Sequence, residues 1–369
     1  MRNKIQTILI YSVRNLILPA INIGLSLMVI RLSNESLWGS FVNYLIWITL
    51  AIQVLGWGNK EFLLRLFSKD PAKIAQNWRN NLWSRSLGFM LIGPLLFFLP
   101  FSPQTYLFAL IWLFSAFLSQ SWEVIILYQK RFFLVIWIEL VGFAMTAGWI
   151  FLQRVSLAID SIMTAYMLGQ ALKAILLTIF LRDTTQITGK FSFERKHLIQ
   201  AFPFLLVGLS GMLNSRIDLY MVNGFLPDTE VGKYQVMTSL FIYIQALAGF
   251  ITQPYVKNIY RLSSEKISRL SFPMAGLGIV ILFLTIPTCW WILNGLYDFG
   301  LSLDYFWLGA LLSFPIFWFL PVLYLCYKHH LERPVLALNI VGIILNIVLN
   351  YFLIPSLGIK GALIGSVAA

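Results

Sequence analysis

The residues best suited to chemistry lie in one apolar stretch of the chain. The segment "MLNSRIDLYMVNGF" at 212–225 places Arg216 and Asp218 two residues apart, with "FPFLLVGLSG" before it and "FIYIQALAGF" after it. A charge at the centre of a membrane helix costs about 2.5–3.5 kcal/mol on insertion scales, so such residues mark structure or a solute pathway. The arginine could bind an anion such as a phosphate, and the carboxylate could hold a proton or a cation.

Residues two apart on a helix point in directions that differ by about 200°, so this pair cannot share one face. One face carries Arg216, Tyr220 and Asn223, and another carries Gly211, Asn214 and Asp218. We expect Arg216 to meet the solute and Asp218 to bond to neighbouring helices or to balance the charge. The alternative is a purely structural Arg216 that pairs with a carboxylate elsewhere.

Two further helices carry polar residues at helical spacing. The first polar stripe consists of Ser12, Asn15, Pro19, Asn22 and Ser26, and the second of Asn339, Gly342, Asn346 and Asn350. Such stripes either line a wet cavity or pack helices together through small and amide side chains. We take the first stripe, with Asn15 and Asn22, as a cavity candidate, and interpret the second as helix packing. Arg14 points away from the first stripe and is a weaker candidate.

The elements that must position these residues are membrane helices. The 369 residues are 59% hydrophobic and 11% charged, whereas soluble domains have roughly 45–50% apolar and 25% charged residues. Apolar stretches of about 20 residues recur, and a β-barrel would show short alternating segments instead. The sequence therefore predicts an all-α polytopic membrane protein.

Periodicity predicts about twelve helices. We expect them near 5–30, 37–57, 82–99, 105–127, 132–152, 158–181, 197–225, 231–252, 271–294, 304–326 and 334–354, with the last opening at 358. From 358 to Ala369 the chain rises only about 16 Å at 1.5 Å per residue, which is too little to span a membrane. Either the chain is truncated there, as the repeat suggests, or its last helix is a stub.

The basic residues predict the orientation of these helices. Of the 27 Lys and Arg, 20 would lie on one side of the membrane, and 14 of these fall in the segments 60–85, 182–196 and 257–269. By the positive-inside rule, that side and the N-terminus are cytoplasmic. The net charge of +12 thus reflects topology, and no basic soluble domain suggests a nucleic-acid partner.

The chain carries signs of an internal duplication. Gly39 in "LWGSFVNY" aligns with Gly232 in "EVGKYQVM", 193 residues later, and "ELVG" at 139–142 aligns with "NIVG" at 339–342. Because each half holds an even number of helices, the two halves would be parallel repeats. We therefore expect a six-helix lobe over 1–181 and a second lobe over 182–369.

Other ionisable residues suggest neither an enzyme nor a metal site. Glu123, Glu139 and Lys173 lie near the predicted cytoplasmic boundary, where snorkelling or pairing between helices explains them. His197, His329 and His330 have no ligand spacing, and we expect them to be solvated. No phosphate-binding loop motif or sizeable soluble domain occurs, so we expect no catalytic residue, cofactor or metal.

The segments "RIDLYMVNGFL", "VGKYQVMTSL" and "LNIVGIILNIVLNYFLIPSLGIKGALIGS" resemble the bacterial polysaccharide or O-antigen flippases. These belong to the superfamily that also contains the MATE multidrug exporters. The resemblance implies a V-shaped pair of six-helix lobes in the bacterial inner membrane. It also implies transport of an isoprenoid-pyrophosphate-linked oligosaccharide for polysaccharide or lipopolysaccharide synthesis. Arg216, helped by Arg14, would attract the pyrophosphate, and a glycan polymerase and chain-length proteins would be partners.

Two other functions are compatible with the sequence. A MATE-like antiporter of drugs or metabolites would share the architecture, and its carboxylates would bind H⁺ or Na⁺ as the coupling ion. A membrane-embedded glycan polymerase or ligase would be expected to carry a large periplasmic loop with paired Arg or His. The short periplasmic links here argue against the polymerase.

Overall fold

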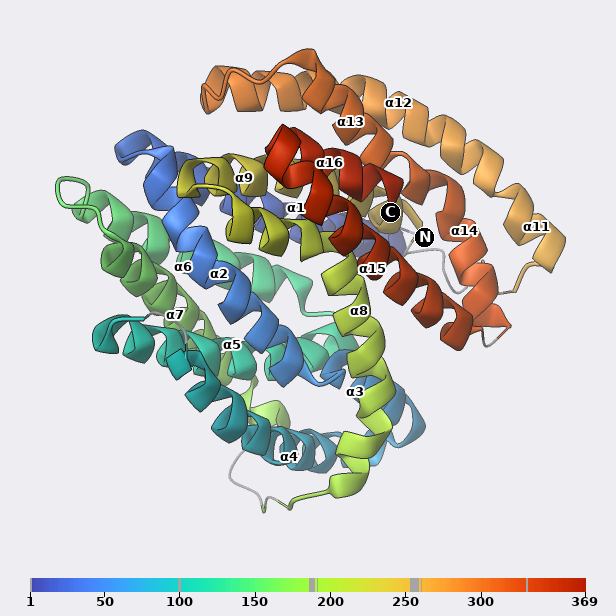
Figure 1. Ribbon diagram of the computed structural model, residues 1–369. Helices are drawn as coiled ribbons and strands as arrows, with labels where there is room; N and C mark the ends of the chain where they lie inside the picture. Colours follow the sequence, from blue (N-terminus) through green and yellow to red (C-terminus); the bar gives the residue numbers. More distant parts are fainter. Residues whose placement is uncertain are drawn as a thin grey trace. The chain divides into compact units, whose positions relative to one another are not determined.

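The computed structural model describes residues 2–98, 101–185, 190, 192–252, 259, 261–329 and 331–369, with the backbone alone over 2–15. Within these ranges every regular element is a helix (Figure 1). The expected all-α architecture is confirmed.

The helix bounds follow the expected ones closely. They are α1 (Arg2–Leu32), α2 (Glu35–Gly56), α3 (Asn59–Lys69), α4 (Ile74–Leu95), α5 (Pro103–Gln129), α6 (Phe132–Leu152), α7 (Ile159–Thr185), α8 (Arg195–Phe225), α9 (Asp228–Thr252), α11 (Ser264–Arg269), α12 (Ser271–Trp290), α13 (Leu303–Ser313), α14 (Pro315–Lys328), α15 (Glu332–Leu357) and α16 (Ile359–Ala368). Short turns η1 (Pro71–Lys73), η2 (Leu96–Phe98) and η4 (Trp291–Leu296) adjoin α4 and α12.

The segment 59–69 departs from the expectation of a basic loop, because it forms α3. Its sequence "NKEFLLRLFSK" buries Phe62, Leu63 and Phe67 and exposes Arg65 and Lys69. This helix is amphipathic, and its apolar side chains recur at helical spacing. Because its charged residues were counted toward a basic cytoplasmic loop, this amphipathic pattern was overlooked. Helix α4 likewise begins at 74 rather than 82.

Nine helical segments of the described chain are long and apolar enough to cross a membrane. Shorter apolar helices cover Leu16–Leu32 and Ile359–Ala368. Large apolar side chains are widely exposed, with Phe283 of α12 at 81% and Leu91 of α4 at 72%. Soluble proteins rarely expose apolar surface on this scale, so lipid is its natural environment. The chain is a multi-pass helical membrane protein.

The first compact unit comprises residues 1–21 and 43–209. Its core gathers buried residues from α3 to α7 and the first turns of α8, among them Trp78, Trp122, Ile138 and Leu181. The rings of Trp78 and Trp122 stack with centroids 4.3 Å apart. The Trp78 indole N–H donates to the carbonyl of Ser121 at 2.8 Å, so the buried ring keeps its polar atom satisfied.

The second compact unit comprises residues 22–42 and 210–369, and it is organised around a crossing of α2 and α9. A Cβ on Gly39 would overlap the carbonyl of Asp228, and a Cβ on Gly232 would lie 2.7 Å from the carbonyl of Glu35. Ser40 donates to the Asp228 carboxylate, and the Lys233 ammonium lies 3.1 Å from the Glu35 carboxylate. Each residue on α2 has its counterpart on α9 193 positions later, so the crossing is pseudo-symmetric.

This crossing explains why the compact units differ from the two sequence halves. The start of α2 packs on α9, and Arg31 at the end of α1 donates to the carbonyl of Leu296 at 2.5 and 2.8 Å. Residues 22–42 of the first half therefore cluster with the second half. The division into lobes 1–181 and 182–369 remains a prediction about the repeat, and the contacts define a different partition.

We predict that a cysteine at Val155 will be labelled from the periplasmic side and one at Lys266 will not. Val155 is 93% exposed in the link between α6 and α7, and Lys266 is exposed on α11. Basic residues concentrate near Lys266, so the positive-inside rule places that segment in the cytoplasm. A membrane-impermeant maleimide on intact cells, with lysed cells as the control, measures both. The reverse labelling pattern would invert the predicted topology.

Candidate functional site

Three residues on α9 form a polar stripe that reaches three other helices of the second unit. Gln235, Ser239 and Tyr243 are spaced four residues apart, so they share one face of α9. The Gln235 amide donates to Ser239 at 3.2 Å, and the Trp38 indole of α2 donates to Gln235 at 3.0 Å. We call these three residues the α9 stripe.

The α9 stripe brings together two of the predicted site residues. Asn22 of α1 donates to the Tyr243 hydroxyl at 3.2 Å, and Arg216 of α8 donates through Nη1 to Ser239 at 3.2 Å. Helices α1 and α8 therefore present polar side chains to successive turns of one face of α9. Both residues were selected as cavity candidates from the sequence.

The Arg216 guanidinium is half-buried and has one hydrogen-bond partner among the described residues, the neutral Ser239. No carboxylate of the described chain lies within 4 Å of it, Asp218 included. The group has five N–H donors in a rigid fork. Most of this donor capacity is thus available to an anion, in contrast to a structural arginine paired with a carboxylate.

Asp218 also reaches α9, where it enters a chain of buried hydrogen bonds. Its Oδ2 accepts from the Tyr234 hydroxyl of α9 at 2.5 Å and from Ser366 of α16 at 2.9 Å. Ser366 in turn accepts from Asn346 of α15 at 3.3 Å, and Asn346 accepts from Asn350 at 2.6 Å. Asp218, Tyr234, Asn346 and Asn350 are all buried. This buried polar chain ties α8, α9, α15 and α16 together.

The second polar stripe therefore acts in helix packing at Asn346 and Asn350. Asn350 Oδ1 is buried without a partner among the described atoms, beside the closely approaching Gly365. Asn339 donates weakly to Ser210 of α8 at 3.4 Å. Asn214 is exposed, and its Oδ1 would lie 3.0 Å from a Cβ at Gly342, which places α8 against α15 there.

Arg14 and Asn15 lie in α1, but their side chains are outside the described part of the structure. Their roles remain predictions. Ser26 of the same helix hydrogen-bonds the Tyr297 hydroxyl at 2.7 Å, so the far end of the first stripe makes packing contacts.

Sequence reasoning missed Ser239, Tyr243, Tyr234 and Ser366. The α9 stripe, like the stripe on the first helix, recurs at helical spacing, and the same test would have found it. Tyr234 and Ser366 give no comparable signal, because an isolated Tyr or Ser in a membrane helix is compatible with many neighbours. Their pairing with Asp218 depends on tertiary packing.

Charged residues elsewhere follow the pairing expectation, with one exception. Lys173 pairs with Glu139 between α7 and α6, and Lys60 lies 3.9 Å from Glu123. His197 was expected to be solvated, but it is buried, with Nε2 3.1 Å from Glu194. It lies under the edge of the Phe62 ring, because α3, which the sequence reading took for a loop, covers it. His330 lies outside the described residues.

The chemistry that this arrangement offers is anion binding at Arg216 and proton or cation binding at Asp218. Among the described residues, no three His, Cys, Asp or Glu side chains gather into a metal site. Both side chains reach α9, Arg216 at Ser239 and Asp218 at Tyr234, although the 200° separation predicts different directions for them.

No protein-family model and no curated protein matches the chain. Solved structures do match it over nearly its whole length. An inward-facing multidrug resistance MATE family transporter of the MOP superfamily shares 14% identity over 96% of this chain and 94% of its own, with a TM-score of 0.65. The inward closed lipid II flippase MurJ shares 15% identity over 95% and 84%, with a TM-score of 0.61.

A Vibrio cholerae MATE transporter is also similar, at 14% identity over 99% of this chain and 92% of its own, with a TM-score of 0.56. At this level of identity the likeness concerns the fold. The chain therefore has the all-helical fold that MATE transporters and a lipid flippase share.

Proposed function

We propose that this protein is a flippase that moves an isoprenoid-pyrophosphate-linked oligosaccharide across the bacterial inner membrane for polysaccharide or O-antigen synthesis. The fold is compatible with lipid flipping, since MurJ has it. The observation that supports this proposal most strongly is the guanidinium of Arg216. It lies in a membrane-spanning helix, and the described residues give it no carboxylate partner.

Such an arginine favours an anionic solute over a cationic one. A central cation costs about 2.5–3.5 kcal/mol to insert, and a bound pyrophosphate would offset that cost through charge-assisted hydrogen bonds. Asn22 and Tyr243, one turn further along the α9 stripe, offer neutral hydrogen-bonding groups suited to sugar hydroxyls. The expected partners are the lipid-linked substrate, membrane lipids, and a polymerase with chain-length proteins.

Arg216→Ala is expected to reduce glycan export at least tenfold at normal protein level, and Arg216→Lys to retain part of it. Lysine keeps the charge without the planar fork that binds phosphate oxygens in pairs. The measurement is surface glycan by immunoblot in a host that depends on this chain for export. The amount of each variant protein in the membrane is measured in the same cells.

Arg154→Ala serves as the matched control, because Arg154 is exposed in the link after α6 and lies over the Phe151 ring. It should export normally. Normal export by Arg216→Ala, or a loss that tracks disappearance of the protein, would refute the role of Arg216 in substrate binding.

The alternative function is a MATE-like antiporter of drugs or metabolites, and Asp218 is the observation that favours it. This carboxylate is buried and has no cation within 4 Å among the described residues, so a proton or Na⁺ could neutralise it. Asp218→Asn distinguishes the two functions within the same assay. Asparagine still accepts from Tyr234, so a flippase should continue to export glycan, whereas a cation-coupled antiporter should lose drug efflux.

A further inference from the structure

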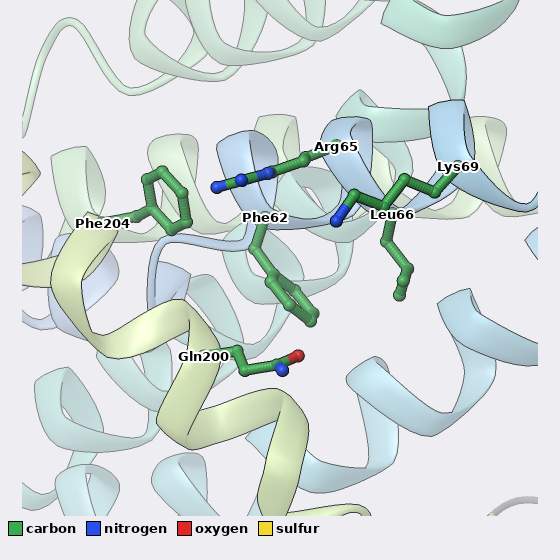
Figure 2. A pocket seen from close by; sticks show the side chains of 6 residues that line it. All are labelled: Phe62, Arg65, Leu66, Lys69, Gln200 and Phe204. Carbon is green, nitrogen blue, oxygen red and sulfur yellow. The ribbon is translucent and has the colours of Figure 1, made fainter. Parts of the chain in front are cut away.

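The first compact unit contains a cavity of about 270 Å³ between α3 and the start of α8. Its lining consists of Phe62, Arg65, Leu66, Lys69, Gln200 and Phe204. Figure 2 shows the Arg65 guanidinium extending from α3 toward the Phe204 ring, with the Lys69 ammonium turned back beside Leu66. The Gln200 amide extends from α8 toward the Phe62 ring. We call this cavity the α3–α8 pocket.

The polar side chains of the α3–α8 pocket are not used by the protein itself. Among the described residues, neither Arg65 nor Lys69 has a carboxylate within 4 Å, and the Gln200 amide makes no hydrogen bond. The nearest acids in sequence do not neutralise them. Glu61, one turn before Arg65, makes no ion pair with it, and Asp70 pairs with Lys73 at 3.3 Å. The lining contains two cations and no acid.

The α3–α8 pocket has a defined shape because the junction of α2 and α3 is fixed on α8. Trp57 and Gly58 have left-handed backbone angles, with φ of 45° and 63°. The Trp57 indole donates to the carbonyl of Leu198 at 3.0 Å. A Cβ on Gly58 would lie 2.6 Å from the Cβ of Phe204, so α8 approaches this turn as closely as a glycine allows.

We propose that the α3–α8 pocket binds the phosphate of an anionic membrane phospholipid. The Arg65 fork can bind two phosphate oxygens, Lys69 adds a point charge, and Gln200 adds a neutral donor. The cavity is smaller than the roughly 300–1,000 Å³ of sites for drug-sized ligands, so it suits a headgroup better than an oligosaccharide. Phe62, Leu66 and Phe204 supply the apolar part of its lining.

The expected topology places this pocket where such lipids are abundant. Segments 60–80 and 183–196 are predicted to be cytoplasmic, and the cytoplasmic leaflet carries the anionic lipids that attract Lys and Arg near its surface. The lipid site shares no residue with Arg216 or the α9 stripe, and it requires no transport activity. The two proposals can therefore fail independently.

The test is the affinity of the purified full chain, in dodecyl maltoside, for tail-labelled phosphatidylglycerol, measured by fluorescence anisotropy. The Arg65→Ala, Lys69→Ala double variant is expected to bind at least tenfold more weakly than a control variant that also lacks two cations, because it removes the charge-assisted hydrogen bonds to the phosphate. Arg65→Lys should lose less. The Lys266→Ala, Arg269→Ala double variant is the matched control, since both residues are exposed on α11, on the same predicted side, and it also removes two cations.

Removing two non-specific surface cations could weaken binding by up to about 30-fold, at about 1 kcal/mol for each, so the loss is measured against the control variant. An Arg65→Ala, Lys69→Ala variant that binds like the Lys266→Ala, Arg269→Ala control would overturn the site, as would equal wild-type affinity for tail-labelled phosphatidylcholine. Inorganic phosphate distinguishes the source of the phosphate group. If millimolar phosphate displaces the lipid from the wild type, the pocket binds a soluble phosphate and the lipid assignment is wrong. A thermal unfolding midpoint equal to that of the wild type shows that each variant is folded.

Discussion

Gly39→Ala will lower the thermal unfolding midpoint of the detergent-solubilised protein by several degrees, and Gly232→Ala will do the same. The added Cβ on Gly39 would overlap the carbonyl of Asp228, which is backbone and cannot rotate away as a side chain could. Overpacking of this kind costs about 1–3 kcal/mol when the helices separate to relieve it. The separation would also disturb the hydrogen bond from Ser40 to Asp228 and the ion pair of Lys233 with Glu35.

Gly249→Ala on the same helix α9 is the matched control, because a Cβ there would have no neighbour within 4 Å among the described residues. It should leave the midpoint unchanged or raise it slightly, since alanine favours a helix over glycine. The midpoint of the Gly39→Ala, Gly232→Ala double variant should fall by less than the sum of the two single decreases, because either substitution separates the same two helices. A wild-type midpoint for Gly39→Ala would show that α2 and α9 do not approach this closely.

Arg85→Ala is expected to give the largest loss of stability in the first unit. Arg85 is 2% exposed and donates to Asn81 at 2.9 Å, to Ser121 at 2.5 Å and to the carbonyl of Leu55 at 3.1 Å. Its guanidinium also lies over the Phe117 ring, with the central carbon 4.9 Å from the ring centroid. Each buried polar atom left without a partner costs about 1–3 kcal/mol. Several such atoms would lose their partner at once, so we expect the free energy of unfolding to fall by about 3 kcal/mol or more.

The measurement is again the unfolding midpoint, combined with limited proteolysis at the junction of α2 and α3. Leu55 ends α2, so loss of its partner should loosen that junction and expose it to protease. Arg65→Ala provides the control, since Arg65 is exposed on α3 and has no partner among the described residues. Equal midpoints for Arg85→Ala and Arg65→Ala would mean that Arg85 does not hold the junction together.

Hydropathy and periodicity predicted most of the fold because membrane helices bury their own backbone hydrogen bonds and need only length and apolarity. The bounds of α6, at 132–152, coincide with the expected ones. The failures concern charge. Counting Arg85 with the cytoplasmic cations treats it as a solvated residue, whereas it is a buried residue of α4 that carries structural hydrogen bonds. Charge counting reports which side a segment lies on, and it does not report whether a given cation is solvated.

The candidate site could be predicted from the sequence only where the spacing of polar residues along one helix indicates their directions. Helix geometry predicts different directions for Arg216 and Asp218, but the structure brings both side chains to α9, at Ser239 and Tyr234. The partners themselves are set by packing between helices, for which the sequence offers only the repeat. Gly39 and Gly232 were aligned as equivalents, but an alignment does not indicate that the two glycines touch each other.

The buried polar chain has a consequence for the order in which the protein is made. Tyr234 follows Asp218 by 16 residues along the chain, whereas Ser366 follows it by 148 residues. At a synthesis rate of about 5–20 residues per second, the second partner follows roughly 7–30 s later. During that interval the nascent chain holds a membrane carboxylate with half of its final side-chain hydrogen bonds. A protonated Asp218, or a chaperone that shelters α8 until the last helix emerges from the ribosome, would carry the chain through this period.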